Sequence, residues 1–155
     1  MPSVRAQIFA YRDLRLQEVV AALSMKTFLL NPREPLGADQ FDGIAVMDGG
    51  DREPASLTGG VADMELEFSV AWFVAESDGM TIEDKLDAAY VAISDKLLDP
   101  DKIQMGGLAI DIRRLGISEP QIGRPERGSM YLGAQSMDFA VRYFEREGAA
   151  SSVGP

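Results

Sequence analysis

The feature that most constrains this chain is the stretch MELEFSVAWFVAE, residues 64–76, in which apolar and polar side chains alternate. A period of two places successive side chains on opposite faces of a β-strand. One face carries Glu65 and Glu67. The opposite face is wholly apolar and consists of Met64, Leu66, Phe68, Val70, Trp72 and Val74. The pattern predicts a half-buried antiparallel strand, with Trp72 in the core and an outer side that meets solvent or another subunit.

A second alternating stretch, SMDFAVRYFERE at residues 136–147, lies close to the end of the sequence. Its apolar row runs from Met137 to Tyr143, but its other face also carries an apolar side chain, Phe144. We expect a second long strand here, and the mixed face raises the question of what covers Phe144.

Two shorter stretches predict the remaining strands. GIAVMDGG has a four-residue apolar body at 44–47 and is expected to stop at its glycines, so that residues 48–63 form a long polar connection. In GLAIDIRRLGIS, residues 107–118, the alternation changes phase after Ile112. One extra residue at Arg113-Arg114 explains the change, and a β-bulge is expected there.

Two segments have helical spacing. The first begins after Ser3, a good N-cap, and runs to about Leu30, as one disturbed helix or two short ones, before Asn31-Pro32 ends it. The second follows the cap Thr81 and extends to residue 98, with an apolar stripe at three- and four-residue steps.

The order of these elements is helix, strand, strand, helix, strand, strand, which is typical of an α+β fold. We predict an antiparallel or mixed sheet of about four strands with both helices packed on one face. The chain of 155 residues has the length of one domain, expected over residues 1–148, with a flexible C-terminal tail at 149–155.

The composition excludes several kinds of chemistry, because the sequence contains neither cysteine nor histidine. Disulfides, thiolate or histidine metal sites and the usual catalytic triads are therefore impossible. We predict no catalytic residue, metal or cofactor. An enzyme that uses carboxylates alone, with Glu65, Glu67 or Asp111, stays as an alternative.

The formal net charge is −10, which disfavours binding to duplex DNA and to anionic membranes. The first residues lack the apolar core of a signal peptide, and no apolar run is long enough to span a membrane. We expect the protein to be made and kept in a cytoplasm.

Four arginines stand out in this acidic chain: Arg113, Arg114, Arg124 and Arg127. All four fall around the last predicted hairpin. A solvated loop and salt bridges to a neighbouring subunit are about equally favoured explanations. A phosphate site is the least favoured, since no aromatic partner or helix N-terminus accompanies the cluster.

The whole chain up to Gly148 resembles the tail terminator proteins (minor tail proteins) of long-tailed bacteriophages. The segments that carry the resemblance are SVRAQI, REPL, MDGGD, MELEFSVAWFVAE, IEDKLDAAYVAISDKLL, GGLAIDIRRLGIS and MDFAVRYFEREG. They match in pattern and position and include no catalytic motif.

The resemblance implies a non-enzymatic virion protein of the tail and neck, assembled in the host cytoplasm. Such proteins form a ring of six copies on the tail tube, stop its polymerisation and join the tail to the head connector, while DNA passes through without specific binding. A ring implies contacts between subunits, for which Phe73, Phe144 and the four arginines are the expected residues. The acids expected to face its lumen are Glu65, Glu67, Asp48 and Asp51.

Two alternatives remain at this stage. Another ring protein of the neck, involved in head–tail completion, has a similar sequence pattern. A small acidic enzyme or ligand-binding domain belongs to a different class, and its mark would be a deep pocket with convergent carboxylates of raised pKa.

Overall fold

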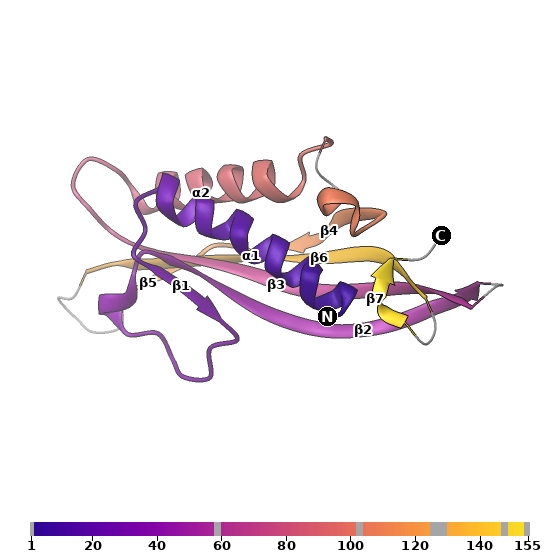
Figure 1. The fold of residues 1–155 in the computed structure, drawn as a ribbon. Coiled ribbons are helices and arrows are strands. Elements are labelled where there is room, and N and C mark those ends of the chain that lie inside the picture. Colours follow the sequence, from indigo (N-terminus) through magenta and orange to yellow (C-terminus); the bar gives the residue numbers. More distant parts are fainter. Residues whose placement is uncertain (1, 58–59, 102–103, 125–129, 147–148, 154–155) are drawn as a thin grey trace.

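The computed structural model describes residues 2–57, 60–101, 104–124, 130–146 and 149–153. They form two layers, a mixed seven-stranded sheet and two helices that lie across one of its faces (Figure 1). The elements are α1 (Val4–Ala22), β1 (Thr27–Leu30), the 3₁₀ turn η1 (Ala38–Gln40), β2 (Gly43–Leu57), β3 (Val61–Ala75), α2 (Ile82–Leu97), the 3₁₀ turn η2 (Met105–Gly107), β4 (Asp111–Ile117), β5 (Gln121–Gly123), β6 (Leu132–Arg146) and β7 (Ala149–Val153).

The sheet has the order β1-β2-β3-β6-β4, and β5 and β7 also pair with β6. Strand β1 runs parallel to β2, and the other pairs are antiparallel. The α+β class, the mixed sheet and the placement of both helices on one face are therefore confirmed. The predicted number of about four strands is wrong, because three short strands, β1, β5 and β7, had no recognisable alternation.

Strand β2 continues far beyond its predicted end and forms a long hairpin with β3. The polar residues from Asp48 onward, expected as a loop, pair with β3 across two register shifts. A Cβ on Gly49 would lie 2.7 Å from the carbonyl oxygen of Glu67, so a glycine permits close approach of the two strands there. The glycines mark an irregularity within the strand and not its end.

The first predicted helical segment is also divided. Helix α1 ends at Ala22, and Ser24 has a left-handed backbone with φ of 53°. The chain then forms β1 at one end of the sheet. At the other end of the sequence, residues 149–153, expected within a flexible tail, form β7.

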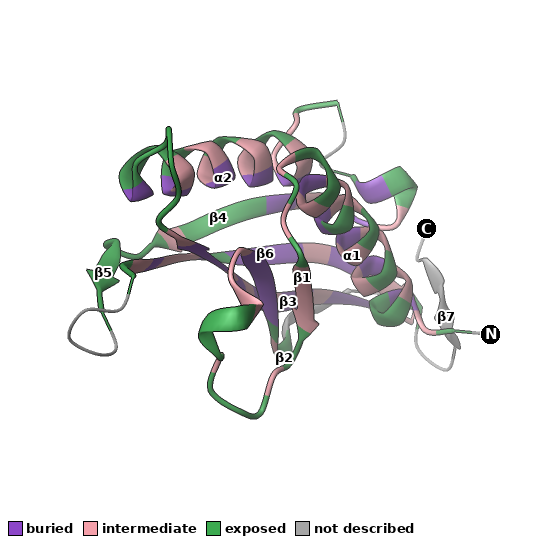
Figure 2. Ribbon diagram, turned by 90° about the vertical axis from the view of Figure 1, so that its left-hand side faces the viewer, coloured by how far each residue is buried: buried purple, intermediate pink, exposed green. Residues whose placement is uncertain are grey.

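The core lies between the helices and the alternating rows of β3 and β6, whose buried residues are coloured in Figure 2. Trp72 is fully buried, and its Nε1 donates a hydrogen bond of 3.1 Å to the carbonyl oxygen of Leu86 in α2. Phe68 and Phe139 stack across the two central strands at a centroid distance of 5.3 Å. The prediction that Trp72 packs against the second helix is confirmed.

The predicted helix caps are confirmed as well. Ser3 Oγ accepts a hydrogen bond from the Ala6 amide, and Thr81 Oγ1 accepts one from the Asp84 amide, each at 3.1 Å. The predicted bulge in β4 is present, one residue later than expected: the register shifts between Arg114 and Gly116, so Leu115 is the extra residue. Neither described helix has the length and apolar character needed to cross a membrane.

Candidate functional site

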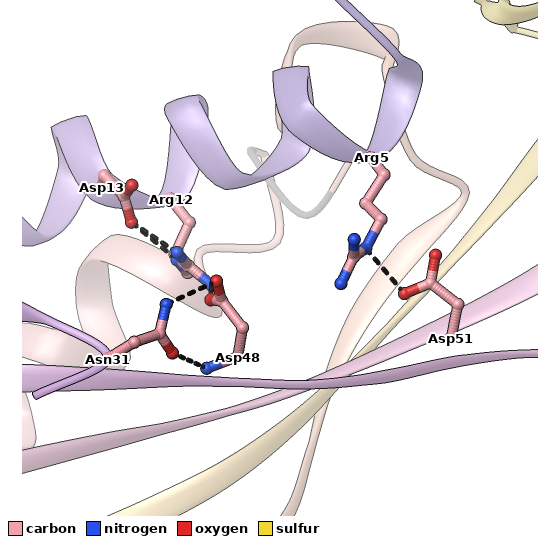
Figure 3. Close-up of polar contacts among 6 residues, drawn as sticks. All are labelled: Arg5, Arg12, Asp13, Asn31, Asp48 and Asp51. Atoms are coloured by element: carbon pink, nitrogen blue, oxygen red, sulfur yellow. Dashed lines mark hydrogen bonds and ion pairs between the residues drawn. The ribbon is translucent and has the colours of Figure 1, made fainter. Parts of the chain in front are cut away.

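A buried arginine fixes α1 on the sheet. Arg12 is 1% exposed, and its guanidinium donates to Asp48 Oδ1 at 2.7 Å and to Asp13 Oδ1 at 2.7–2.8 Å (Figure 3). The same group lies over the rings of Phe9 and Phe68, 4.3 and 4.9 Å from their centroids. Cation–π contact and ion pairing together compensate for its burial.

Asp48 is held from a second side by Asn31, which follows β1. Asn31 Nδ2 donates to Asp48 Oδ2 at 2.9 Å, and the Asp48 amide donates to Asn31 Oδ1 at 2.8 Å (Figure 3). Burial of Asp48 is the largest single influence and raises its pKa. The hydrogen bonds from Asn31 and Arg12 and the nearby positive charges outweigh it, so the pKa lies below the ordinary value.

Asp51 is part of the same interface between α1 and the sheet. Arg5 pairs with it at 2.9 Å (Figure 3), and the Tyr143 hydroxyl donates to it at 3.2 Å. Burial, followed by the charge of Asp51, raises the pKa of Tyr143. Asp48 and Asp51, predicted to face a lumen, thus lie on the helix side of β2, where their charges are matched by arginines of α1.

The opposite, helix-free face of the sheet carries a ladder of ion pairs. Glu65, 6% exposed, lies between Arg52 at 2.7 Å and Arg113 at 3.1 Å. Beside it, Asp63 pairs with Arg142 at 2.7 Å. The hydrogen bond from Arg52 is the main cause that lowers the pKa of Glu65, and the bond from Arg142 lowers that of Asp63.

This ladder accounts for two more of the residues expected in functional roles. Glu65 has a lowered pKa, whereas a catalytic acid of the enzyme alternative would need a raised one. Arg113 is exposed, but its guanidinium is already paired within the chain. Glu67, half-buried on the same face, belongs to no ion pair among the residues that the structure describes.

The other predicted interface residues have different surroundings. Arg114 donates to the Tyr90 hydroxyl at 2.6 Å, and Arg124 lies over the ring of Tyr131, 4.6 Å from its centroid. Phe144 is half-buried beside Arg142. Arg127 lies outside the described residues.

Phe73, expected at a subunit interface, is 1% exposed in the single chain. Phe41 of the same chain packs edge-on against it at a centroid distance of 4.9 Å. The apolar side chain on the mixed face of β3 is therefore covered by the chain's own loop before β2, which periodicity alone does not reveal.

Exposed apolar side chains gather at the edge of the sheet formed by β4 and β5. Strand β4 is the last in the sheet order, so one of its sides has no neighbouring strand within the part of the chain that the structure describes. We call edge patch the apolar residues of this region, which are 41–49% exposed: Leu115, Ile117, Ile122, Met130 and Tyr131. An open strand edge that is also apolar is a typical protein-interaction surface.

A groove runs between this edge and α2. It consists of two adjoining hollows of about 640 and 310 Å³ that share Glu83 and Ile122. Its apolar lining includes Leu86, Ile117 and Tyr131, and no lysine or arginine is among the described residues that line it. Its acids are Glu76, Glu83, Asp84 and Asp87. The groove therefore favours an apolar partner segment that carries positive charge.

The described residues contain no group of three or more carboxylates placed to hold a metal ion. The arrangement is one of surfaces and ion pairs, and the strongest candidate for function is the edge patch with its groove. Two sequence signals pointed to this region: the arginines around the last hairpin, and the bulge expected at Arg113-Arg114, which the structure places at Leu115, where it turns an apolar residue out of a regular strand.

No family model and no curated protein matches the sequence. Among solved structures, one similar chain belongs to the virion of a native gene transfer agent particle. It is 21% identical, the match covers 90% of each chain, and the TM-score is 0.43.

Proposed function

We propose that this protein is a structural component of a phage-type virion that forms a ring, of six copies by analogy with the family it resembles, on the end of the tail tube. The ring ends polymerisation of the tube and joins the tail to the head connector. No catalytic step is part of this role.

The edge patch is the observation that carries the proposal. Five large apolar side chains are nearly half exposed beside an unpaired strand edge, and a monomer gains nothing from leaving them in water. Contact with another subunit removes that surface from water. Arg113, Arg114 and Arg124 flank the patch and provide polar contacts at its rim.

Five of the seven segments that carry the resemblance lie in the elements expected for them, which supports the proposal. SVRAQI begins α1, MELEFSVAWFVAE lies almost wholly in β3, and IEDKLDAAYVAISDKLL covers α2. GGLAIDIRRLGIS contains β4, and the part of MDFAVRYFEREG up to Arg146 lies in β6. These five segments have the secondary structure expected for them, whereas MDGGD lies within β2 and not at its end.

A lumen that DNA can traverse fits the charge of the protein. The formal net charge of −10 repels phosphate, and repeated copies in a ring add to that field. Asp48, Asp51 and Glu65 are paired with arginines of the same chain, so their charges are compensated. The support for a DNA-repelling lumen therefore comes from the overall net charge and from Glu67.

A second candidate within the same class is another ring of the neck, which the edge patch supports equally. Tube length separates the two. Tail tube protein of the same virion, polymerising in vitro, should stop at shorter lengths in electron micrographs when this protein is added. Unchanged lengths at saturating protein would assign the ring to another position in the neck.

A further inference from the structure

The sheet ends on its other side in β1, and this second edge is complementary to the groove. Leu30 is 50% exposed at the end of β1. Lys26 and Arg33, which flank the strand, are exposed and form no ion pair within the described part of the chain. An apolar residue flanked by two cations is complementary to a groove with an apolar lining and an acidic rim.

We infer that the β1 edge of one copy, Lys26 to Arg33, packs into the groove between α2 and the β4–β5 edge of the next copy. Leu30 then covers the apolar floor at Leu86 and Ile122, and the two cations face the acidic rim at Glu83 and Asp87. This inference rests on the proposed ring and names its two contact surfaces.

The topology supports a ring from this contact. β1 and β4 occupy opposite ends of the sheet order, so the two surfaces lie on different sides of one molecule. A contact between unlike surfaces is head-to-tail, and repeated head-to-tail contacts close into a ring when the rotation allows it. A two-fold dimer would instead need one self-complementary surface.

The dimensions of the two surfaces also agree. The four residues of β1 extend about 13 Å at the usual rise of a strand. Along α2, the second hollow runs from Glu83 to Tyr90, about 10 Å at the rise of a helix. The four residues of β1 therefore span this hollow, and Lys26 and Arg33 lie beyond the two ends of the strand.

Charge reversal on each surface tests the contact, with assembly measured by sedimentation velocity as the protein concentration for half-maximal assembly. Glu83→Lys with Asp87→Lys should raise that concentration at least tenfold, and Lys26→Glu with Arg33→Glu should do the same. An equimolar mixture of the two double variants should assemble better than either one alone, because each groove then meets a β1 edge of opposite charge.

Asp95→Lys is the matched control, since Asp95 is exposed on the same helix outside the groove. If wild type assembles and the groove variants behave like Asp95→Lys, the subunits meet elsewhere; the inference falls and the proposed ring stands. If wild type itself stays monomeric at 100 µM, both the inference and the ring are contradicted.

Discussion

Arg12 is the residue on which the seating of α1 depends most. It occupies the apolar face of the helix, four residues from both Ile8 and Leu16, and is as buried as they are. Its spacing was the sequence signal for burial. The partners that make burial tolerable, Asp48 and Phe68, come from distant parts of the chain and are not evident from the sequence.

Replacement of Arg12 by alanine should lower the free energy of unfolding by about 3 kcal/mol, because it leaves Asp13 and Asp48 without their buried partner. Arg5→Ala is the control. Arg5 is 44% exposed, and its pair with Asp51 should contribute less than about 1 kcal/mol. Urea unfolding measures the loss of stability in both variants. Equal losses in the free energy of unfolding would show that Arg12 acts as an ordinary surface charge.

Glu65 makes stability depend on pH. Its pKa in the folded protein is lowered from 4.5, so the folded state favours the ionised carboxylate. That contribution is complete above the unfolded value and is lost as the pH falls below 4.5 through the folded pKa. Glu65→Gln should therefore destabilise the protein more at pH 7 than at pH 3.

The measurement for Glu65 is urea unfolding of wild type and variant at the two pH values. The control is Glu34→Gln, on an exposed loop. Its free energy of unfolding should differ from that of wild type by the same small amount at both pH values. A Glu65→Gln effect that is independent of pH would mean that Arg52 and Arg113 do not stabilise the carboxylate.

At the scale of elements, the long strands were predictable and the short ones were not. β3 and the main part of β6 have apolar rows long enough to establish both element type and buried face. β1 has a threonine followed by three apolar residues, begins five residues after the end of α1, and becomes a strand only because β2 offers a parallel edge. Long-range pairing, absent from local sequence, decided its structure.

The second half of β2 shows the same limit. Its composition is that of a loop, with two glycines among acids, but β3 holds it in the hairpin. The acidic groove was likewise not predictable as a unit, because Glu76 and Glu83 meet Ile122 only after α2 docks beside β5. The sequence shows that these residues are acidic or apolar, but it does not show that they lie side by side in one groove.

The docking of α2 on β6 can be tested at Gly133. A Cβ at this position would lie 2.5 Å from Cγ2 of Ile82 and 3.3 Å from Cδ1 of Leu86. Gly133→Ala should therefore force the first turns of α2 away from the sheet and cost about 1–3 kcal/mol of stability in thermal or urea unfolding.

Gly116→Ala is the matched control, because a Cβ on this strand residue meets nothing within 4 Å. It should change stability by less than about 0.5 kcal/mol. Equal stability of the two variants would show that α2 does not lie closely on β6 at Gly133.

For the whole molecule, the acidic surface predicts how the protein behaves toward DNA. With a net charge of −10, it should show no measurable binding to duplex DNA in a gel-shift or anisotropy assay, even at low salt where charge contacts are least screened. Micromolar binding that weakens steeply with salt would indicate a basic path and contradict a repelling lumen.

We propose that copies of this chain assemble into a closed ring through the edges of their sheets. The test is the mass of the purified protein, measured by sedimentation velocity at about 10–100 µM, a range in which contacts of micromolar affinity form. Negative-stain images of the same sample show whether the assembly is a ring. We expect a single closed ring, with six copies as the expected number, that is lost when Ile122 in the edge patch is changed to aspartate. A monomer throughout this range, or an assembly indifferent to Ile122→Asp, would contradict it.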